Sequence, residues 1–339
     1  MGAAAGLTLL ASLAIGVSPA QAVPTAAQAA ASDTTRVGIS TPPPQGDPTK
    51  YGKVVSGDPN AAFKKSVTFG LKGKPPAPPS KNLAKKTPGP VSYIYAGGRQ
   101  TPATPPTGVS SLNTVSTPYI NPTWDYHTLN ENAVQSADEQ QAVEVGVTRD
   151  QGTFGDNKVR LFVYYWLNGV ESCYNGCGWV DYAANTTFNA GADLTSYANA
   201  NTEMVFQTEH TNNAWWIGFG PNDGTANWIG SFPDTIWTGA TPSVTNFKQV
   251  SYFQTFGEVA AGTVTTCADM GLGPVPVMAT PTAGARLSNV TYSGQPTSNV
   301  VLTAFATQPT WYQSYRQNST ATPPVTSTRT IRYGGPATC

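Results

Sequence analysis

The stretch that decides the fold runs from Gln141 to Val180 and reads QAVEVGVTRDQGTFGDNKVRLFVYYWLNGVESCYNGCGWV. In residues 142–148 valines alternate with other residues, which predicts a β-strand with one apolar face. A turn rich in Asp, Asn and Gly follows, and residues 159–166 form a second, strongly apolar strand. Glu144 lies on the face opposite the valines of the first strand. A carboxylate at this position indicates that the second face meets water, a cleft or a partner.

Short apolar segments continue from about residue 121 to the end of the chain, separated by turns of Asn, Gly and Asp. The expected strands are residues 141–148, 159–166, 178–183, 202–208, 214–219, 249–260, 286–293 and 299–306. Almost no amphipathic helix pattern is present. This spacing predicts an all-β fold, an antiparallel β-sandwich of two packed sheets.

The N-terminus has the pattern of a secretory signal peptide over residues 1–22. Its apolar core runs from Leu7 to Val17, and Ala-Gln-Ala at 20–22 fits a cleavage site. The basic segment that normally precedes such a core is missing, so we expect the true start upstream of Met1. The apolar run is too short to span a bilayer. We therefore expect a secreted, extracellular protein that makes no use of a membrane.

Residues 23–122 are rich in Pro, Ala and Lys, which predicts a largely irregular leader in which 61–69 and 91–97 dock as short strands or turns. Residues 1–122 hold 11 Lys or Arg against 3 Asp and no Glu, whereas residues 123–339 hold 8 against 9 Asp and 7 Glu. A basic leader on an acidic β-sandwich domain is typical of a propeptide held in cis by charge. The same charge balance argues against nucleic acid as a partner.

The chain has four cysteines, an even number that favours disulfides in an exported protein. Three pairings are open, and we favour a local Cys173–Cys177 bridge with a long-range Cys267–Cys339 bridge. The cysteines lack a Cys-x2-Cys repeat, so a metal site is disfavoured. We expect no metal and no cofactor.

The familiar catalytic templates are missing. The sequence has no Gly-x-Ser-x-Gly, no HExxH, no phosphate loop and no dinucleotide fingerprint, and neither His127 nor His210 lies in a triad context. The remaining candidates are carboxylates. Glu144 and Glu258 alone stand in apolar, Gly-bearing strand patterns, whereas Glu131 belongs to a polar segment and is expected to be solvated. If the strands of Glu144 and Glu258 are neighbours, the two carboxylates share one concave face.

Five sequence pieces, in this order and spacing, resemble the neprosin family. They are VEVGV (143–147), NKVRLFVYYW with CYNGCGWV (157–180), NAWWIGFG (213–220), WIGSFP (228–233) and FGEV (256–259). The resemblance covers residues 123–339. The family comprises glutamic peptidases, best known as plant prolyl endopeptidases, and its domain is a β-sandwich. By this similarity Glu144 and Glu258 match the two catalytic glutamates of the family.

The resemblance implies an endopeptidase whose paired glutamates share one proton. The ionised carboxylate takes a proton from water, and the protonated one hydrogen-bonds the carbonyl oxygen of the substrate, with an acidic pH optimum. This chemistry needs no covalent intermediate. The family often has Trp-Gly-Gly-Glu where this chain has Thr255-Phe256-Gly257-Glu258, so the substrate wall near Glu258 is expected to differ.

Residues that bind a substrate are expected among large side chains near the dyad. Tyr165, Trp215 and Trp216 are candidates to seat a proline ring, and Gln207 is a candidate donor to the oxyanion. The expected partner is a peptide or protein, proline-rich if the family preference holds, and the enzyme is expected to be a monomer. Two alternatives stay open. One is a secreted β-sandwich that binds carbohydrate or protein through exposed tryptophans, and the other is a glycoside hydrolase using the same carboxylates.

Overall fold

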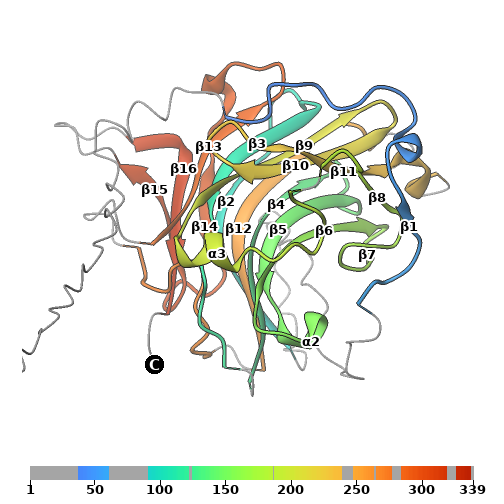
Figure 1. Cartoon of the computed structure of the whole chain (residues 1–339). Coiled ribbons are helices and arrows are strands. Elements are labelled where there is room, and N and C mark those ends of the chain that lie inside the picture. Colours follow the sequence, from blue (N-terminus) through green and yellow to red (C-terminus); the bar gives the residue numbers. More distant parts are fainter. Residues whose placement is uncertain are drawn as a thin grey trace, which may run out of the picture.

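The computed structural model describes residues 37–60, 91–121, 124–185, 187–238, 247–262, 265–276, 284–318 and 326–336. Two antiparallel sheets pack face to face in it, so the predicted all-β sandwich is confirmed (Figure 1). The predicted signal peptide and Cys339 lie outside the described residues. None of the described helices has the length and apolarity that crossing a membrane requires.

The larger sheet has nine strands. Their order is β1 (Val54–Val55), β8 (Trp179–Asp181), β11 (Asn227–Pro233), β10 (Ala214–Pro221), β9 (Glu203–Thr211), β3 (Gly108–Thr114), β13 (Ala285–Tyr292), β16 (Thr326–Gly334) and β15 (Gln313–Asn318). The smaller sheet has seven strands. Their order is β14 (Thr303–Ala306), β2 (Ser92–Gln100), β12 (Tyr252–Ala261), β4 (Asp125–Gln135), β5 (Ala142–Arg149), β6 (Val159–Leu167) and β7 (Val170–Glu171).

Short helices serve as connections between these strands. Helix α2 (Gln151–Phe154) joins β5 to β6, and α3 (Thr195–Asn199) precedes β9. Single 3₁₀ turns occur at Pro48–Lys50, Asp234–Ile236 and Thr297–Asn299. Asp150 begins α2 as its N-cap, accepting a hydrogen bond from the Thr153 backbone N–H at 2.8 Å.

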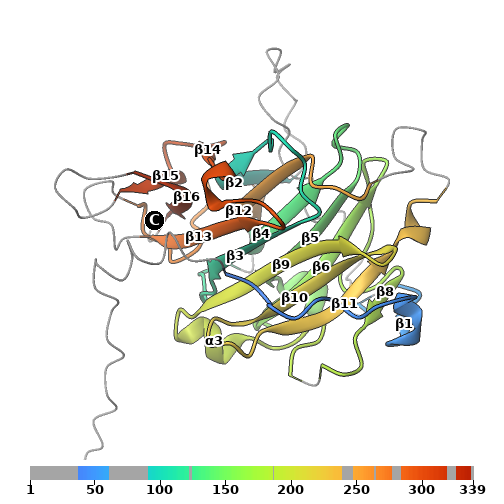
Figure 2. The same ribbon diagram turned by 90° about the horizontal axis from the view of Figure 1, so that it is seen from above.

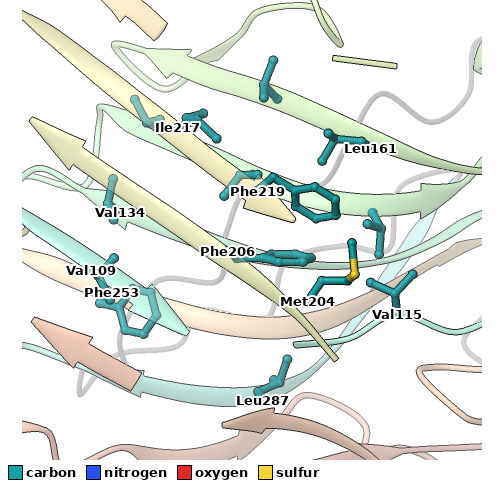
Figure 3. Close-up of a cluster of buried hydrophobic side chains, with 14 of the residues drawn as sticks. Val109, Val115, Val134, Leu161, Met204, Phe206, Ile217, Phe219, Phe253 and Leu287 are labelled. Atoms are coloured by element: carbon teal, nitrogen blue, oxygen red, sulfur yellow. The ribbon is translucent and has the colours of Figure 1, made fainter. Parts of the chain in front are cut away.

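The core lies between the sheets and consists of the apolar faces that strand alternation predicts. Val143, Val145 and Val147 of β5 point inward and meet side chains of the larger sheet. Figure 3 shows part of this interior, where Phe206 and Phe219 of the larger sheet lie among residues such as Val134 and Leu161 of the smaller one. Their burial is the main apolar contribution to stability.

All eight strands expected from the sequence are present within a few residues of their predicted bounds. The structure differs from the sequence-based expectation mainly in the leader. Residues 92–100 and 108–114, which we assigned to an irregular leader, form β2 and β3, and each lies inside a sheet with a partner on both sides. The docking predicted for 91–97 is therefore confirmed, and the folded domain begins well before residue 123. The other stretch, 61–69, lies outside the described residues.

Residues 37–60 also belong to the folded body. They cross the outer face of the larger sheet and end beside β8, as Figure 2 shows in blue. The Ile39 backbone N–H donates to Gln207 Oε1 at 2.6 Å, and Trp228 Nε1 donates to the Thr41 carbonyl at 2.9 Å. Ile39 packs so closely on Gly218 that a Cβ there would lie 2.2 Å from its Cδ1. This part of the leader is a strap on the sandwich.

The local disulfide is the one that the sequence predicts. Cys173 and Cys177 are bonded, with their Cα atoms 5.8 Å apart. Cys267 is also disulfide-bonded. Its predicted partner, Cys339, is not among the described residues, so that pairing stays a prediction.

Candidate active site

The outer face of the smaller sheet carries the candidate catalytic residues. Valines of β5 point to the core, so Glu144 points the other way, and Glu258 of β12 does the same because Val259 faces the core. Glu144 pairs with Ala133 of β4, and Glu258 pairs with Leu129 of the same strand. The two glutamates therefore share one face of one sheet.

Strands β5 and β12 are not neighbours, contrary to the arrangement that the sequence led us to expect. Strand β4 lies between them. Glu131 of β4 pairs with Gly146 on one side and Phe256 on the other, which makes it a diagonal neighbour of both Glu144 and Glu258. Such diagonal positions are about 7–8 Å apart. Glu144, Glu131 and Glu258 thus form a diagonal line across three strands.

Glu131 is the residue that the sequence reasoning placed wrongly. It was expected to be solvated, but its side chain is 0% exposed, as are those of Glu144 and Glu258. Strand alternation could have revealed its position. Residues 127, 129, 131 and 133 of β4 occupy one face of the strand, which brings His127 and Glu131 beside Glu258. The polar composition of the segment concealed this face.

Glu258 is hydrogen-bonded to a buried imidazole. His127 Nε2 lies 2.7 Å from Glu258 Oε1, and both side chains are fully buried. On the other side of the ring, His127 Nδ1 lies 3.8 Å from Asp150 Oδ2, an ion-pair distance but too long for a hydrogen bond. Burial raises the pKa of Asp150, and the imidazole of His127 together with hydrogen bonds from Thr153 and Gly152 opposes this rise.

Glu144 has a different partner. Trp166 Nε1 of β6 donates to Glu144 Oε1 at 3.0 Å. Aromatic side chains line both flanks of the glutamate diagonal. On the β6 side they are Phe162, Tyr164, Trp166 and Tyr174, and on the β2 side they are Tyr93, Tyr95, Phe256 and Phe305. These walls lower the local dielectric, which strengthens every interaction between the carboxyl groups.

Tyr95 brings a phenol to the same place, because it pairs directly with Glu258 across β2 and β12. Burial raises the pKa of Tyr95 well above its usual value, and negative charge on Glu258, Glu131 and Glu144 adds to the rise. The phenol therefore stays protonated and can donate a hydrogen bond.

The four residues predicted to bind substrate lie elsewhere. Trp215 and Tyr165 point into the core, where Trp215 Nε1 donates to the Phe247 carbonyl and the Tyr165 hydroxyl to the Cys177 carbonyl, each at 2.9 Å. Trp216 and Gln207 lie on the outer face of the larger sheet under the strap. In the sequence these residues lie within or near the family motifs, but a local pattern does not fix which face of which sheet a residue occupies.

Gly257 lies directly behind the site. Adjacent strand residues point to opposite faces, so Gly257 faces the core behind Glu258. A Cβ at this position would lie 2.5 Å from Met270 Cγ and 2.5 Å from the Tyr333 ring. The glycine therefore allows close core packing directly behind the site. Among the described residues, no group of three or more His, Cys, Asp or Glu side chains is arranged to hold a metal ion.

Comparison with known proteins gives one family match and two matches to solved structures. The model of the Neprosin family matches residues 126–336. Two crystal structures of Scytalido-glutamic peptidase, one with a peptide-based transition state analog and one with a transition state analog inhibitor, match at 11% and 10% identity with TM-scores of 0.37 and 0.38. Each alignment covers 72% of this chain and 98% of the solved chain. The search of curated proteins finds no match.

The fold and the site together define a β-sandwich protein with a buried carboxylate cluster on the outer face of one sheet. The chain belongs to the Neprosin family, whose model covers most of the sandwich. The family resemblance carried by the sequence pieces between Glu144 and Glu258 is thereby confirmed.

Proposed function

We propose that this protein is a glutamic endopeptidase that hydrolyses peptide bonds with Glu144 and Glu258. The observation that carries the proposal is the diagonal of three fully buried glutamates, Glu144, Glu131 and Glu258, on one sheet face. Such a cluster is costly to bury, and closely spaced buried carboxyl groups are a feature of functional sites. Membership of the Neprosin family supports a peptide as the substrate.

The chemistry follows from the crowding of the carboxyl groups. Neighbouring buried carboxylates cannot all ionise without a large electrostatic cost, so at least one keeps its proton while another acts as a base. The ionised carboxylate takes a proton from water, whose oxygen forms the new bond to the scissile carbonyl carbon. The protonated carboxyl hydrogen-bonds the carbonyl oxygen. When the C–N bond breaks, the leaving nitrogen receives a proton from the site.

Tyr95 and Glu131 complete this proposed site. The phenol of Tyr95 stands opposite Glu258 and stays protonated, so it is suited to donate a hydrogen bond to the developing oxyanion. Glu131 lies between the two catalytic glutamates, and the protons of the site are distributed among these three carboxyl groups. Its negative charge, when present, favours retention of a proton by its neighbours.

A peptide library tests the proposed activity. We expect the purified protein, after removal of any inhibitory leader, to cleave internal bonds of a mixed peptide library, with more cleavage at acidic than at alkaline pH. Mass spectrometry of the products reads the cleaved bonds and therefore the residue preference. Enrichment of proline before the cleaved bond would support a post-proline preference. Absence of cleavage at every pH between 3 and 9 would refute the peptidase proposal.

The part of the leader that precedes β2 is proposed to inhibit the enzyme in cis and to be cut by acid-triggered processing. Acid neutralises carboxylates of the sandwich and so weakens their attraction to a basic segment. We expect incubation of the full chain at falling pH to shorten it, as followed by intact mass. The strap, residues 37–60, is bonded to the larger sheet, so cuts on its C-terminal side should leave it attached. A fully active enzyme with an intact leader would contradict this proposal. We also propose that the protein is secreted and acts as a monomer.

The alternative of a carbohydrate-binding module relied on exposed tryptophans. Trp215, Trp216 and Trp228 are at most 2% exposed, so they are unavailable to stack on a sugar. Trp124 and Trp311 are the exposed tryptophans among the described residues. Neither observation favours a binding module over the peptidase.

A further inference from the structure

We propose that His127 is a positioning residue that designates Glu258 as the general base of the site, with Asp150 behind it as the third member of a buried relay. This inference rests on the proposed peptidase function and deepens it by assigning different roles to the two glutamates. Three residues from three segments converge here. They are Asp150 at the end of β5, His127 in β4 and Glu258 in β12.

The contacts of His127 are specific. Its ring is fully buried, Nε2 is 2.7 Å from Glu258, and Nδ1 faces Asp150 at 3.8 Å. Within the part of the chain that the structure describes, His127 Nδ1 and Asp150 Oδ2 are both buried atoms without a hydrogen-bond partner. Buried polar atoms of this kind normally find partners. Their separation is consistent with a hydrogen bond from Nδ1 to Asp150 that forms when the imidazole gains its second proton.

The consequence for Glu258 follows from simple electrostatics. A hydrogen bond or a positive charge from an imidazole favours the ionised form of a carboxylate. A protonated His127 can donate from both ring nitrogens, to Glu258 and to Asp150, as in triads where a buried carboxylate orients a histidine. Glu258 is thereby held as the base at acidic pH. Glu144, whose partner is the neutral Trp166, is left as the proton donor.

Other titratable groups face this relay from each neighbouring strand or loop. They are Tyr93 and Tyr95 of β2, Glu131 of β4, and Tyr174 after β7. Burial raises the pKa of Tyr95 and of Tyr174, and nearby carboxylates raise it further, so both phenols stay neutral in the pH range of the reaction. Glu131 is the remaining charge that competes with His127 for influence on Glu258.

The chain supplies a matched control. Its only other histidine, His210, forms a similar pair in which Nε2 lies 2.9 Å from Asp234 Oδ1, but His210 belongs to β9 of the other sheet. The variants His127→Gln and His210→Gln therefore remove the same group from two carboxylate pairs. Asp150→Asn removes the charge of Asp150 while keeping a residue type that caps helix α2.

The test compares pH profiles of kcat/KM for cleavage of one peptide. In His127→Gln the acidic limb should move to higher pH by on the order of one unit, with the alkaline limb nearly unchanged. Asp150→Asn should shift the same limb by less, and His210→Gln should reproduce the wild-type profile. An acidic limb in folded His127→Gln that coincides with wild type overturns the inference, as does an equal shift in His210→Gln.

A second readout does not depend on activity and separates this inference from the peptidase proposal. The full chain has two histidines, so imidazole NMR shows two sets of ring signals, and His127→Gln identifies one of them. In Glu258→Gln the titration of His127 should change while that of His210 stays the same. Unchanged titration of both would overturn the relay even if the protein is a peptidase. If His127→Gln does not fold, His210→Gln assigns the signals and the Glu258→Gln titration decides.

Discussion

Replacing Glu258 by Gln should lower kcat/KM for peptide hydrolysis by about 10²–10⁴-fold, the usual contribution of a general base. The amide keeps the size of the side chain and can still bond His127, but it cannot accept a proton from water. Glu144→Gln should cause a loss of similar order, because an amide still donates a hydrogen bond to the carbonyl oxygen but cannot give its proton to the leaving nitrogen. Steady-state kinetics on one peptide cleaved by the wild type measures both.

The control for these variants is Glu171→Gln. Glu171 belongs to β7 at the edge of the same sheet, where its side chain is exposed to solvent. It should leave kcat/KM unchanged. Far-UV circular dichroism and thermal unfolding establish that each variant is folded. Full activity of folded Glu258→Gln or Glu144→Gln would remove that residue from the mechanism.

Glu131→Gln should produce the second largest effect, a loss of activity that grows as the pH rises. A negative charge on Glu131 disfavours ionisation of the adjacent carboxyl groups and so helps the site to keep its catalytic proton. The neutral amide removes this repulsion, and the alkaline limb of the kcat/KM profile should move to lower pH by on the order of one unit. The direction is opposite to that expected at the acidic limb for His127→Gln.

Two comparisons make this test specific. A structural defect would lower kcat/KM at every pH without moving either limb. Glu131→Ala removes the same charge and also leaves a cavity, so it should combine the shift of the alkaline limb with a lower kcat/KM at every pH. Glu171→Gln again serves as the charge-matched control. An unshifted alkaline limb in folded Glu131→Gln would show that Glu131 does not share protons with Glu144 and Glu258.

Much of the fold could be predicted from the sequence because its strands alternate clearly. In β5 the inward valines and the outward Glu144 follow from alternation alone. Strand β4 could not be recognised in this way, since its sequence, DYHTLNENAVQ, is polar on both faces. Inward Asn132 donates to Ser111 Oγ and the Phe206 carbonyl, and outward His127 and Glu131 belong to the site. Buried polar groups replaced the residues that favour strands.

The order of strands was the other missing element. Sequence motifs singled out Glu144 and Glu258 as candidates, but pairing between strands distant in the sequence decides which residues lie next to each other. The insertion of β4 between β5 and β12 put Glu131 and His127 into the cluster. The same limit explains why Trp216 and Gln207 were wrongly expected at the site. They lie within or near a family motif in the sequence, but they occupy the outer face of the larger sheet, which the strap covers. Local patterns do not contain this information.

The proposed mechanism requires that buried glutamates share protons, so that one is ionised while another is protonated. Its most direct test is the pH dependence of kcat/KM for the wild-type enzyme on a single peptide. The account predicts a bell-shaped profile, because one carboxyl group must be ionised and another protonated in the active form. Its maximum should lie on the acidic side of neutrality. A profile that rises to a plateau and stays there at alkaline pH would contradict the account, since no protonated carboxyl group would then be needed for catalysis.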